Sequence, residues 1–320
     1  MRTLIVGSRA SHLARAQVKE FLAPLRDRFP DVEFRHQVIL EGGDRDRKTA
    51  LSQVSARSGG SAFSTEQEAA LVRGEVDVIV HSLKDLPTSN PPGLVLLPPP
   101  GREDMRDALC GSTLAALPQG GRVGTSAARR IAQLLHVRPD LAFVPIRGNV
   151  PPRLNKLRTM NLDGVVLAAA GLVRLGLDDA IGELLPLDQF PPSPGQGALG
   201  IQIREDNELA REILAGTGDP VVDAEVRAER AMLGELHGGC SVPVGAYAKA
   251  TGDMLSLHAQ VTALNGTKQV EARLSGPVSE PEKLGIQVAG LLLDQGAEAI
   301  LSEIRPAAQP VSSRARSAAA

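Results

Sequence analysis

The sequence predicts an α/β protein with two lobes joined by a hinge, followed by a small α+β domain built on three antiparallel strands. Short apolar strands alternate with amphipathic helices over the first two thirds of the chain. Proline-rich breaks at Pro98–Gly101 and Pro191–Gly197 flank the second α/β set, so the chain is expected to cross twice between the lobes. Two lobes joined in this way can close over a ligand.

The first lobe is expected to contain strands at Thr3–Val6, Val32–Leu40 and Val76–Val80, and helices at Ser11–Phe29 and Ser64–Arg73. The continuous apolar run at residues 76–80 is typical of a strand that is buried on both faces of a parallel sheet. Ser64 and Gln67 match a helix-capping pair. The polar segment Glu41–Ala62 predicts a long loop, and loops of that length usually have a function.

The same patterns define the rest of the chain. For the second lobe we expect helices at Ser126–His136 and after Pro152, and strands at Ala108–Cys110, Arg122–Gly124, Leu141–Ile146 and Gly164–Ala168; Ala198–Ile203 is a further strand. For the third domain we expect helices at Val221–Leu236 and Glu280–Gln295, and strands at Val242–Ala250, Met254–Leu264 and Lys268–Leu274. The predicted domains are residues 1–98 with 198–217, residues 102–193 and residues 220–305, and residues 306–320 are expected to be a disordered tail.

The composition is that of a globular cytoplasmic protein. Of the 320 residues, 42% are hydrophobic and 22% are charged, which is ordinary for soluble domains. No apolar run reaches membrane-spanning length, and the N-terminus lacks the regions of a signal peptide. Cys110 and Cys240 lie in unrelated contexts, which argues against a disulfide, and the six histidines show no paired ligand spacing, so no metal site is indicated.

Positive charge is concentrated in the second lobe. Residues 121–175 contain nine Lys and Arg residues and two Asp residues, a net charge of +7 in a chain whose formal net charge is −2. This excess predicts a polyanionic ligand, and arginine is favoured where carboxylates are bound in a forked geometry. Nucleic acid is a weaker alternative, because base stacking needs aromatic residues and these make up 2% of the chain.

Charged residues also occur where predicted strands end, which is where α/β sheets bind ligands. Strand Val76–Val80 runs into His81-Ser82-Leu83-Lys84-Asp85-Leu86-Pro87, which places a cation and an acid at the edge of a cleft. The arginines at similar strand-to-helix junctions are Arg9, Arg129, Arg130, Arg147 and Arg153. Helix starts attract anions through their free N–H groups, so together these residues predict a site for several carboxylates or phosphates.

Cys240 follows two glycines in the segment Leu236-His237-Gly238-Gly239-Cys240-Ser241-Val242-Pro243. Glycine lets the backbone come close to a bound group, and an accessible thiol there is suited to be a nucleophile or an attachment point. A buried structural cysteine is one alternative. A cysteine-dependent acyl transferase with His237 as the base is another, and it would leave no permanent adduct on the protein.

Together these segments resemble the porphobilinogen deaminases, also called hydroxymethylbilane synthases, from about Thr3 to Arg305. The most specific segments are Val80–Pro87, Arg102–Asp104 with Arg106–Ala108, Val123–Ser126 with Arg129-Arg130, Ile146–Asn149 with Arg153-Leu154, Leu167–Gly171 with Arg174–Gly176, Gly195–Ala198, and Ala228–Ala231 leading to Gly238-Gly239-Cys240. Each segment is short, but their order and spacing are characteristic of this family.

The resemblance implies two lobes like those of periplasmic binding proteins, and a dipyrromethane cofactor attached to Cys240 through a thioether. Four porphobilinogen molecules are added head to tail, each with loss of ammonia, and hydrolysis releases hydroxymethylbilane for heme biosynthesis. We therefore expect a cytoplasmic transferase that acts as a monomer and binds neither nucleic acid nor a membrane. A stable thioether would keep the cofactor on the enzyme when the product is cut away.

Asp85 is the residue we expect at the centre of catalysis. A fixed carboxylate stabilises the positive charge that spreads over the pyrrole nitrogen when ammonia leaves, and it can relay protons. By analogy with the family, the residues that bind cofactor and substrate are Arg9, Ser11, Phe63, Ser82, Lys84, Thr125, Ser126, Arg129, Arg130, Arg147, Gly148, Asn149, Arg153, Arg174 and Gln196. No metal is expected. Each pyrrole carries an acetate and a propionate, which matches the positive window.

The sequence departs from the family pattern in several places, including local differences at His12 and Pro151-Pro152. Ala127 stands where the family often has a second serine, and the loop Gln53–Phe63 lacks the lysines that are usual there. The main alternative to a deaminase is a two-lobed binding protein for an anionic metabolite. That alternative explains the lobes and the arginines, but it explains neither Cys240 nor the third domain.

Overall fold

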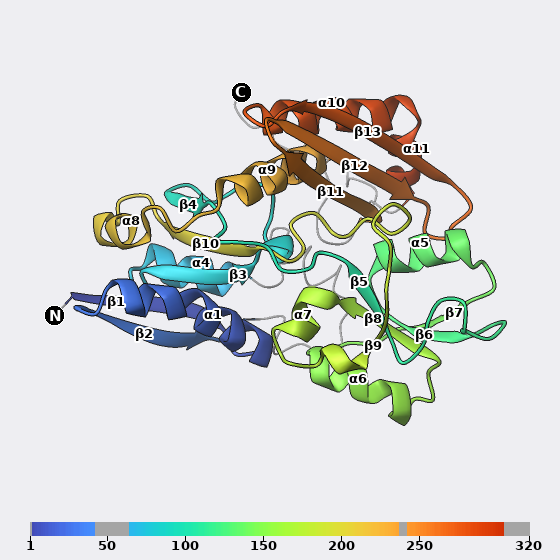
Figure 1. The fold of residues 1–320 in the computed structure, drawn as a ribbon, viewed down its shortest axis with the longest axis horizontal. Helices are drawn as coiled ribbons and strands as arrows, with labels where there is room; N and C mark the ends of the chain where they lie inside the picture. Colours follow the sequence, from blue (N-terminus) through green and yellow to red (C-terminus); the bar gives the residue numbers. More distant parts are fainter. Residues whose placement is uncertain (1, 42–63, 237–241, 304–320) are drawn as a thin grey trace, which may run out of the picture.

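The computed structural model describes residues 2–41, 64–236 and 242–303. Figure 1 shows two α/β lobes beside each other, with a third unit packed over both. The N-terminal lobe, lobe 1, is drawn mainly in blue and cyan, and the second lobe, lobe 2, is green. The third domain, in orange and red, carries the C-terminal part of the chain.

Lobe 1 is built on a five-stranded sheet with the strand order β2-β1-β3-β10-β4. Its elements are β1 (Arg2–Arg9), α1 (His12–Arg28), β2 (Val32–Ile39), α4 (Thr65–Val72), β3 (Val78–Ser82), the 3-10 turn η1 (Leu83–Asp85), β4 (Leu94–Leu97), β10 (Leu199–Arg204) and α8 (Glu208–Leu214). β1 is parallel to β2 and β3, whereas β10 is antiparallel to both β3 and β4. The strand β10 therefore returns to lobe 1 from lobe 2.

Lobe 2 repeats this plan with the strand order β7-β6-β8-β5-β9. Its elements are β5 (Asp107–Cys110), β6 (Arg122–Gly124), α5 (Ala128–Val137), β7 (Ala142–Val144), α6 (Val150–Thr159), β8 (Gly164–Ala168), α7 (Ala169–Val173), the 3-10 turn η2 (Asp178–Ala180) and β9 (Ile181–Leu184). β6 is parallel to β7 and β8, and β5 is antiparallel to β8 and β9. The carboxyl ends of the parallel strands thus meet at one edge of each sheet.

The chain crosses between the lobes twice, and the two crossing segments are joined. Arg102 and Ala198 form an isolated antiparallel bridge. The guanidinium of Arg102 also binds both carboxylate oxygens of Glu229, at 2.8 and 2.9 Å, and both side chains are buried. Since Glu229 lies in the third domain, this ion pair connects that domain to the crossing segments.

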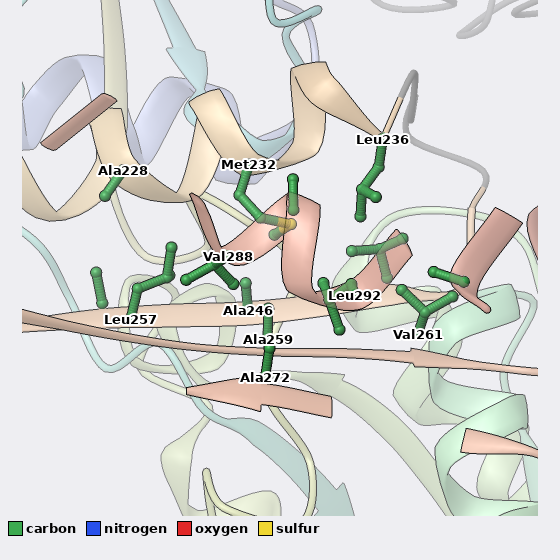
Figure 2. Close-up of a cluster of buried hydrophobic side chains, with 14 of the residues drawn as sticks. Ala228, Met232, Leu236, Ala246, Leu257, Ala259, Val261, Ala272, Val288 and Leu292 are labelled. Carbon is green, nitrogen blue, oxygen red and sulfur yellow. The ribbon is translucent and has the colours of Figure 1, made fainter. Parts of the chain in front are cut away.

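The third domain is a three-stranded antiparallel sheet covered by helices on one face. Its elements are α9 (Pro220–Glu235), β11 (Val244–Thr251), β12 (Met254–Thr262), β13 (Gln269–Pro277), α10 (Pro281–Asp294) and α11 (Ala297–Ser302). Figure 2 shows Met232 of α9 and Val288 and Leu292 of α10 packed against small residues of the sheet, including Ala246 and Ala259. Small side chains on the strands let the two helices lie close to the sheet.

Side chains cap the N-terminal ends of α1 and α4, and the cap of α4 differs from the one predicted. The Ser11 side chain accepts the N–H of Ala14 at 3.1 Å and caps α1. The predicted capping pair Ser64 and Gln67 was wrong, because Ser64 makes no capping hydrogen bond. Instead, the buried carboxylate of Glu41 accepts the N–H groups of Gln67, at 2.9 Å, and Glu66, at 3.3 Å. A carboxylate is well suited to the positive end of a helix.

The predicted fold class is confirmed: two α/β lobes with mixed sheets precede a three-stranded antiparallel domain with helices. The sequence analysis missed the four-residue strands β4 and β9 and the short helices α7, α8 and α11. It placed the start of α6 after Pro152, whereas Val150 begins the helix and the prolines occupy its first turn. Proline is tolerated there because its missing N–H would have no partner within the helix.

The predicted domain boundaries stay a prediction, and residues 306–320 lie outside the described part.

Candidate active site between the two lobes

Lobe 1 presents Lys84 and Asp85 immediately after its central strand. β3 is buried and ends at Ser82, whose hydroxyl binds the amide of Gln17 on α1 at 2.9 Å. The chain then makes the turn η1, in which the buried Leu83 is fixed by a hydrogen bond from its N–H to the carbonyl of Ala198. With Leu83 anchored inward, the next two side chains are both half-buried.

Lys84 is bound to the second crossing segment. Its Nζ donates to Oε1 of Gln196 at 3.0 Å. The pKa of Lys84 is lowered to about 8, mainly by burial and then by the nearby charge of Arg130, while Asp85 and Asp107 act in the opposite direction. The ammonium is therefore surrounded by charged residues of both lobes.

Lobe 1 also provides the end of β1. Arg9 is the last residue of that strand and Ser11 follows as the cap of α1. The Ser11 oxygen accepts the N–H of Ala14, so this side chain has a structural role as the cap of α1. Both positions lie at the edge of the sheet to which Lys84 and Asp85 belong, since β1 and β3 are parallel neighbours.

Lobe 2 holds Thr125 and Ser126 after β6. The buried Thr125 hydroxyl accepts the N–H of Ala127 at 3.2 Å, and the exposed Ser126 hydroxyl donates to the carbonyl of Ile146 at 2.8 Å. These bonds fix the turn that leads into α5. Ala127, which replaces a family serine, is the N-terminal cap residue of α5 and makes no side-chain capping bond.

Arg129 and Arg130, in the first turn of α5, converge on one buried carboxylate. Arg129 Nη1 lies 2.8 Å from Oδ2 of Asp107, and Arg130 Nη2 lies 2.8 Å from Oδ1. Burial alone would raise the pKa of Asp107, but the charges and hydrogen bonds of the two arginines outweigh it and hold that pKa well below its usual range. Arg129 also donates to Gln133 and to the carbonyl of Pro191, and Arg130 donates to the carbonyl of Val166.

The loop before α6 contains the next group of predicted site residues. Gly148 has a φ of +117°, and its carbonyl accepts Nε of Arg153 at 2.6 Å. The Arg147 carbonyl accepts Nζ of Lys156 at 2.9 Å. Asn149 is the exposed N-terminal cap residue of α6 and makes no side-chain capping bond. The loop is thus held by bonds from the helix to the loop carbonyls.

Arg174 links the lobes. It follows α7, and its Nε lies 2.8 Å from Oε2 of Glu20 on α1 while Nη2 donates to the carbonyl of Gly197 at 3.0 Å. Its side chain is 5% exposed. The geometry gives Arg174 a bridging position between lobe 2, lobe 1 and the second crossing segment.

The charged residues of the two lobes form one electrostatic neighbourhood. The pKa of Arg153 is lowered to about 10, mainly by burial. The charges of Arg130, Arg147 and Arg9 also lower it, and the charge of Asp85 raises it. Together with the charges that act on Lys84, this defines a charged cluster of six cations and two acids: Arg9, Lys84, Asp85, Asp107, Arg129, Arg130, Arg147 and Arg153. Such a donor set suits a ligand that carries several carboxylates, because charge-assisted bonds to carboxylates are strong.

Three residues singled out from the sequence, Cys240, His237 and Phe63, lie outside the described residues, as does most of the loop at residues 41–62. The other cysteine, Cys110, is buried in β5, and burial raises the pKa of its thiol to about 11. Cys110 is therefore a structural residue rather than a nucleophile.

The sequence analysis missed the role of Asp107. The residue belongs to the segment Arg106–Ala108 that carried the family resemblance, but nothing in the sequence indicated that it would bind two arginines. The available signal was an acidic residue at the start of an otherwise apolar strand, because such a residue enters the protein interior with the strand and needs cationic partners there.

Among the residues that the structure describes, no helix is both long and apolar enough to cross a membrane, and no group of His, Cys, Asp and Glu side chains could hold a metal ion.

Solved structures with partial likeness include a periplasmic binding protein of Salmonella typhimurium with high arginine specificity, at a TM-score of 0.38 and 15% identity over 69% of this chain and 94% of that chain. Another is a probable amino-acid ABC transporter binding protein of Bacillus subtilis, at a TM-score of 0.39 and 13% identity over 68% of this chain and 90% of that chain.

Comparison of sequences identifies the family. Residues 4–212 match the model of the porphobilinogen deaminase dipyrromethane cofactor binding domain, and residues 224–294 match the porphobilinogen deaminase C-terminal domain. The porphobilinogen deaminase of Geobacter metallireducens is 47% identical over 305 residues, and that of Geobacter sulfurreducens is 46% identical over 306, each covering 95% of both chains. These matches do not favour the alternative of a two-lobed binding protein. The chain belongs to the porphobilinogen deaminase family of transferases.

Proposed function

We propose that this chain joins four porphobilinogen molecules head to tail, with loss of one ammonia at each addition, and releases hydroxymethylbilane by hydrolysis. It works as a cytoplasmic monomer in tetrapyrrole biosynthesis, with domains at residues 1–98 with 198–217, 102–193 and 220–305. The observation that carries the proposal is the charged cluster, in which Asp85 interacts electrostatically with Lys84 of lobe 1 and Arg153 of lobe 2.

The side chains present fit a dipyrromethane cofactor. A dipyrromethane carries four carboxylates, and the charged cluster has six cations against two acids. Cys240 would hold the cofactor through a thioether. When bound, the cofactor supplies the pyrrole carbon to which the first substrate is added.

Arg9, Lys84, Arg147 and Arg153 are the residues we expect to bind the acetate and propionate groups. Arg129 and Arg130 act on the ligand mainly through their charge, because their guanidinium groups already bind Asp107 and main-chain carbonyls. The hydroxyls of Ser11, Ser82, Thr125 and Ser126, with Gly148, Asn149, Arg174 and Phe63, stay predicted contacts. Each charge-assisted hydrogen bond contributes a net gain of about 1.5–3 kcal/mol, so several cations can bind the carboxylates without any one of them being decisive.

Asp85 performs the acid–base steps. Its carboxylate accepts hydrogen bonds from the pyrrole N–H of the substrate, stabilises the positive charge that develops there, and exchanges protons with the leaving amine and the attacked carbon.

The intact mass of the purified protein tests the attachment. Wild-type protein is expected to carry a covalent increment of two pyrrole units, and Cys240→Ser is expected to lack it. Cys110→Ser is the matched control: its thiol is buried and has a raised pKa, so this variant should keep the increment. An unmodified wild-type protein with full deaminase activity would refute the proposal.

A further inference from the structure

Gln196 lies in the second crossing segment, and its side chain touches both lobes. The residue is 1% exposed. Oε1 accepts the ammonium of Lys84 in lobe 1 at 3.0 Å, while Nε2 donates to Oδ1 of Asp107 in lobe 2 at 2.9 Å and to the carbonyl of Met105 at 2.8 Å. One amide therefore spans the junction where the charged cluster is divided between the lobes.

The chemistry of these partners requires an amide. Lys84 can only donate, and Asp107, bound by two arginines, can only accept. A side chain between them must accept on one side and donate on the other. Glutamine does both, whereas an ionised glutamate cannot donate to Asp107, and a methionine of similar length can serve neither partner well.

The backbone around Gln196 is fixed tightly enough to set the direction of its side chain. Gly195 and Gly197 have φ values of +76° and +92°, and a Cβ on Gly197 would collide with the carbonyl of Glu103. The Gln196 carbonyl accepts Nε of Arg102 at 3.0 Å. Glu229, the partner of Arg102, accepts the N–H of Gly195 at 2.7 Å. The third domain thus anchors the segment that carries Gln196.

We propose that Gln196 is a positioning residue for the deaminase reaction: it holds the ammonium of Lys84 against Asp107 and the two arginines of lobe 2, and so keeps Lys84 charged and in place beside Asp85. Its catalytic consequence rests on the function proposed above. Its effect on Lys84 does not depend on that function.

The electrostatics of Lys84 explain why a positioning residue is needed. Burial and the charges of Arg130 and Arg129 destabilise the ammonium, and Asp85 and Asp107 stabilise it. A hydrogen bond to the charged form of a group favours that form. Without the Gln196 oxygen, Lys84 would lose its proton at a lower pH and would be free to turn away from Asp107.

Two substitutions separate this role from a structural one, because they change the environment of Lys84 in opposite directions. Gln196→Met removes the acceptor, so the pKa of Lys84 is expected to fall. Gln196→Glu adds a negative charge beside the ammonium, so the pKa is expected to rise, in each case by about one pH unit. A loss of packing alone would not produce opposite signs.

Competitive labelling with acetic anhydride measures this directly. The full-length protein is labelled in trace amounts across a range of pH, and acetylation of the peptide that contains Lys84 is quantified by mass spectrometry. The wild-type midpoint is expected near pH 8. If Gln196→Met fails to fold, Gln196→Asn, which is one methylene shorter and cannot span both partners, is expected to show the same fall.

Gln202→Met is the matched control. Gln202 is a fully buried amide of lobe 1 that binds His81 and Glu68. This variant is expected to lower stability and to leave the Lys84 midpoint unchanged. Equal midpoints in Gln196→Met, Gln196→Glu and wild type, or shifts of the same sign, would overturn the inference. Because labelling needs no turnover, a wild-type protein without deaminase activity would refute only the proposed function.

Discussion

Lobe 1 and lobe 2 share one strand topology but hold their carboxylates differently. In both lobes an antiparallel strand begins opposite the last residue of a parallel strand: Leu199 pairs with Ser82 in lobe 1, and Asp107 pairs with Ala168 in lobe 2. The equivalent position is therefore apolar in one lobe and acidic in the other. Lobe 1 places its acid, Asp85, three residues after the end of the strand, where it is half-buried.

The difference shows that similar strand ends can serve stability or chemistry. Asp107 is 1% exposed, and both of its oxygens are taken by the arginines of α5, so it neutralises and orients cations. Asp85 lies within the field of Lys84 and Arg153. Lobe 2 thus holds buried cations in fixed positions, and lobe 1 presents the acid that we propose acts on the substrate.

The sharpest test of this contrast is Asp85→Asn. It is expected to lower kcat by about 10²–10⁴-fold or more, because positioned proton transfer typically contributes that factor. The free energy of unfolding is expected to change little. Steady-state assays with thermal unfolding measure both. Asp31→Asn, at an exposed ion pair with Arg2, is the control and should keep full activity. Near-normal turnover of Asp85→Asn would remove Asp85 from the mechanism.

Asp107→Asn is expected to show the converse, a large loss of stability. Removing one partner of a buried ion pair costs about 3–5 kcal/mol, and here two buried guanidinium groups lose their carboxylate. Urea unfolding of the full chain measures the change. In Glu75→Gln, which breaks the exposed pair with Arg73, we expect a much smaller loss, because solvent screens exposed ion pairs. Equal stability of the two variants would contradict the stabilising role of Asp107.

The interior of lobe 1 should also be more sensitive to acid. Burial lowers the pKa of His81 to about 4, whereas the equivalent residue of lobe 2 is Leu167, since His81 pairs with Gly200 and Leu167 with Ala108. The folded state therefore binds fewer protons than the unfolded state between pH 6.5 and 4, and the unfolding free energy falls as pH falls through that window, by at most about 3 kcal/mol.

The variant His81→Asn isolates this contribution, because an amide can donate to Gln202 without titrating. Its unfolding free energy is expected to depend less on pH between 6.5 and 4 than that of the wild type, measured by urea unfolding at several pH values. The same dependence in both proteins would exclude His81 as its source.

The smallest expected effect is a change in the shape of a pH profile. Because the pKa of Lys84 is about 8, kcat/KM of the wild type should fall as pH rises through 8 and the ammonium is lost. Lys84→Arg keeps the charge and should extend the plateau to higher pH. Lys249→Arg, at an exposed position of β11, is the control. An unchanged alkaline limb in Lys84→Arg would assign the limb to another group.

Much of the fold could be predicted from the sequence because the apolar pattern is clear: a continuous run at β3, and periodic apolar positions in α1 and the third domain. The strands β4 and β9 were missed because four residues carry too little periodicity. For the site, the sequence indicated which residues follow strand ends but not what surrounds each of them. Arg129 and Arg153 follow similar strand ends in the sequence, but only the tertiary structure shows that Arg129 is buried against Asp107 while Arg153 lies near Asp85.

Gln196 illustrates the same limit. Its glycine neighbours indicated a turn near the crossing, but its two partners lie 112 and 89 residues away in the sequence. Contacts at that separation depend on how the lobes are set against each other, and local patterns do not contain this information.

The carboxylate of Glu229 has a consequence for how this enzyme can be dissected. It accepts two bonds from Arg102, one from Gly195 and one, at 2.8 Å, from the N–H of Ala248. A fragment truncated at residue 219 would keep Arg102 and lose its acidic partner. The buried guanidinium between the two crossing segments would then have no carboxylate to bind. We therefore expect that the two lobes do not fold stably without the third domain, although they have the architecture of a complete two-lobed binding protein.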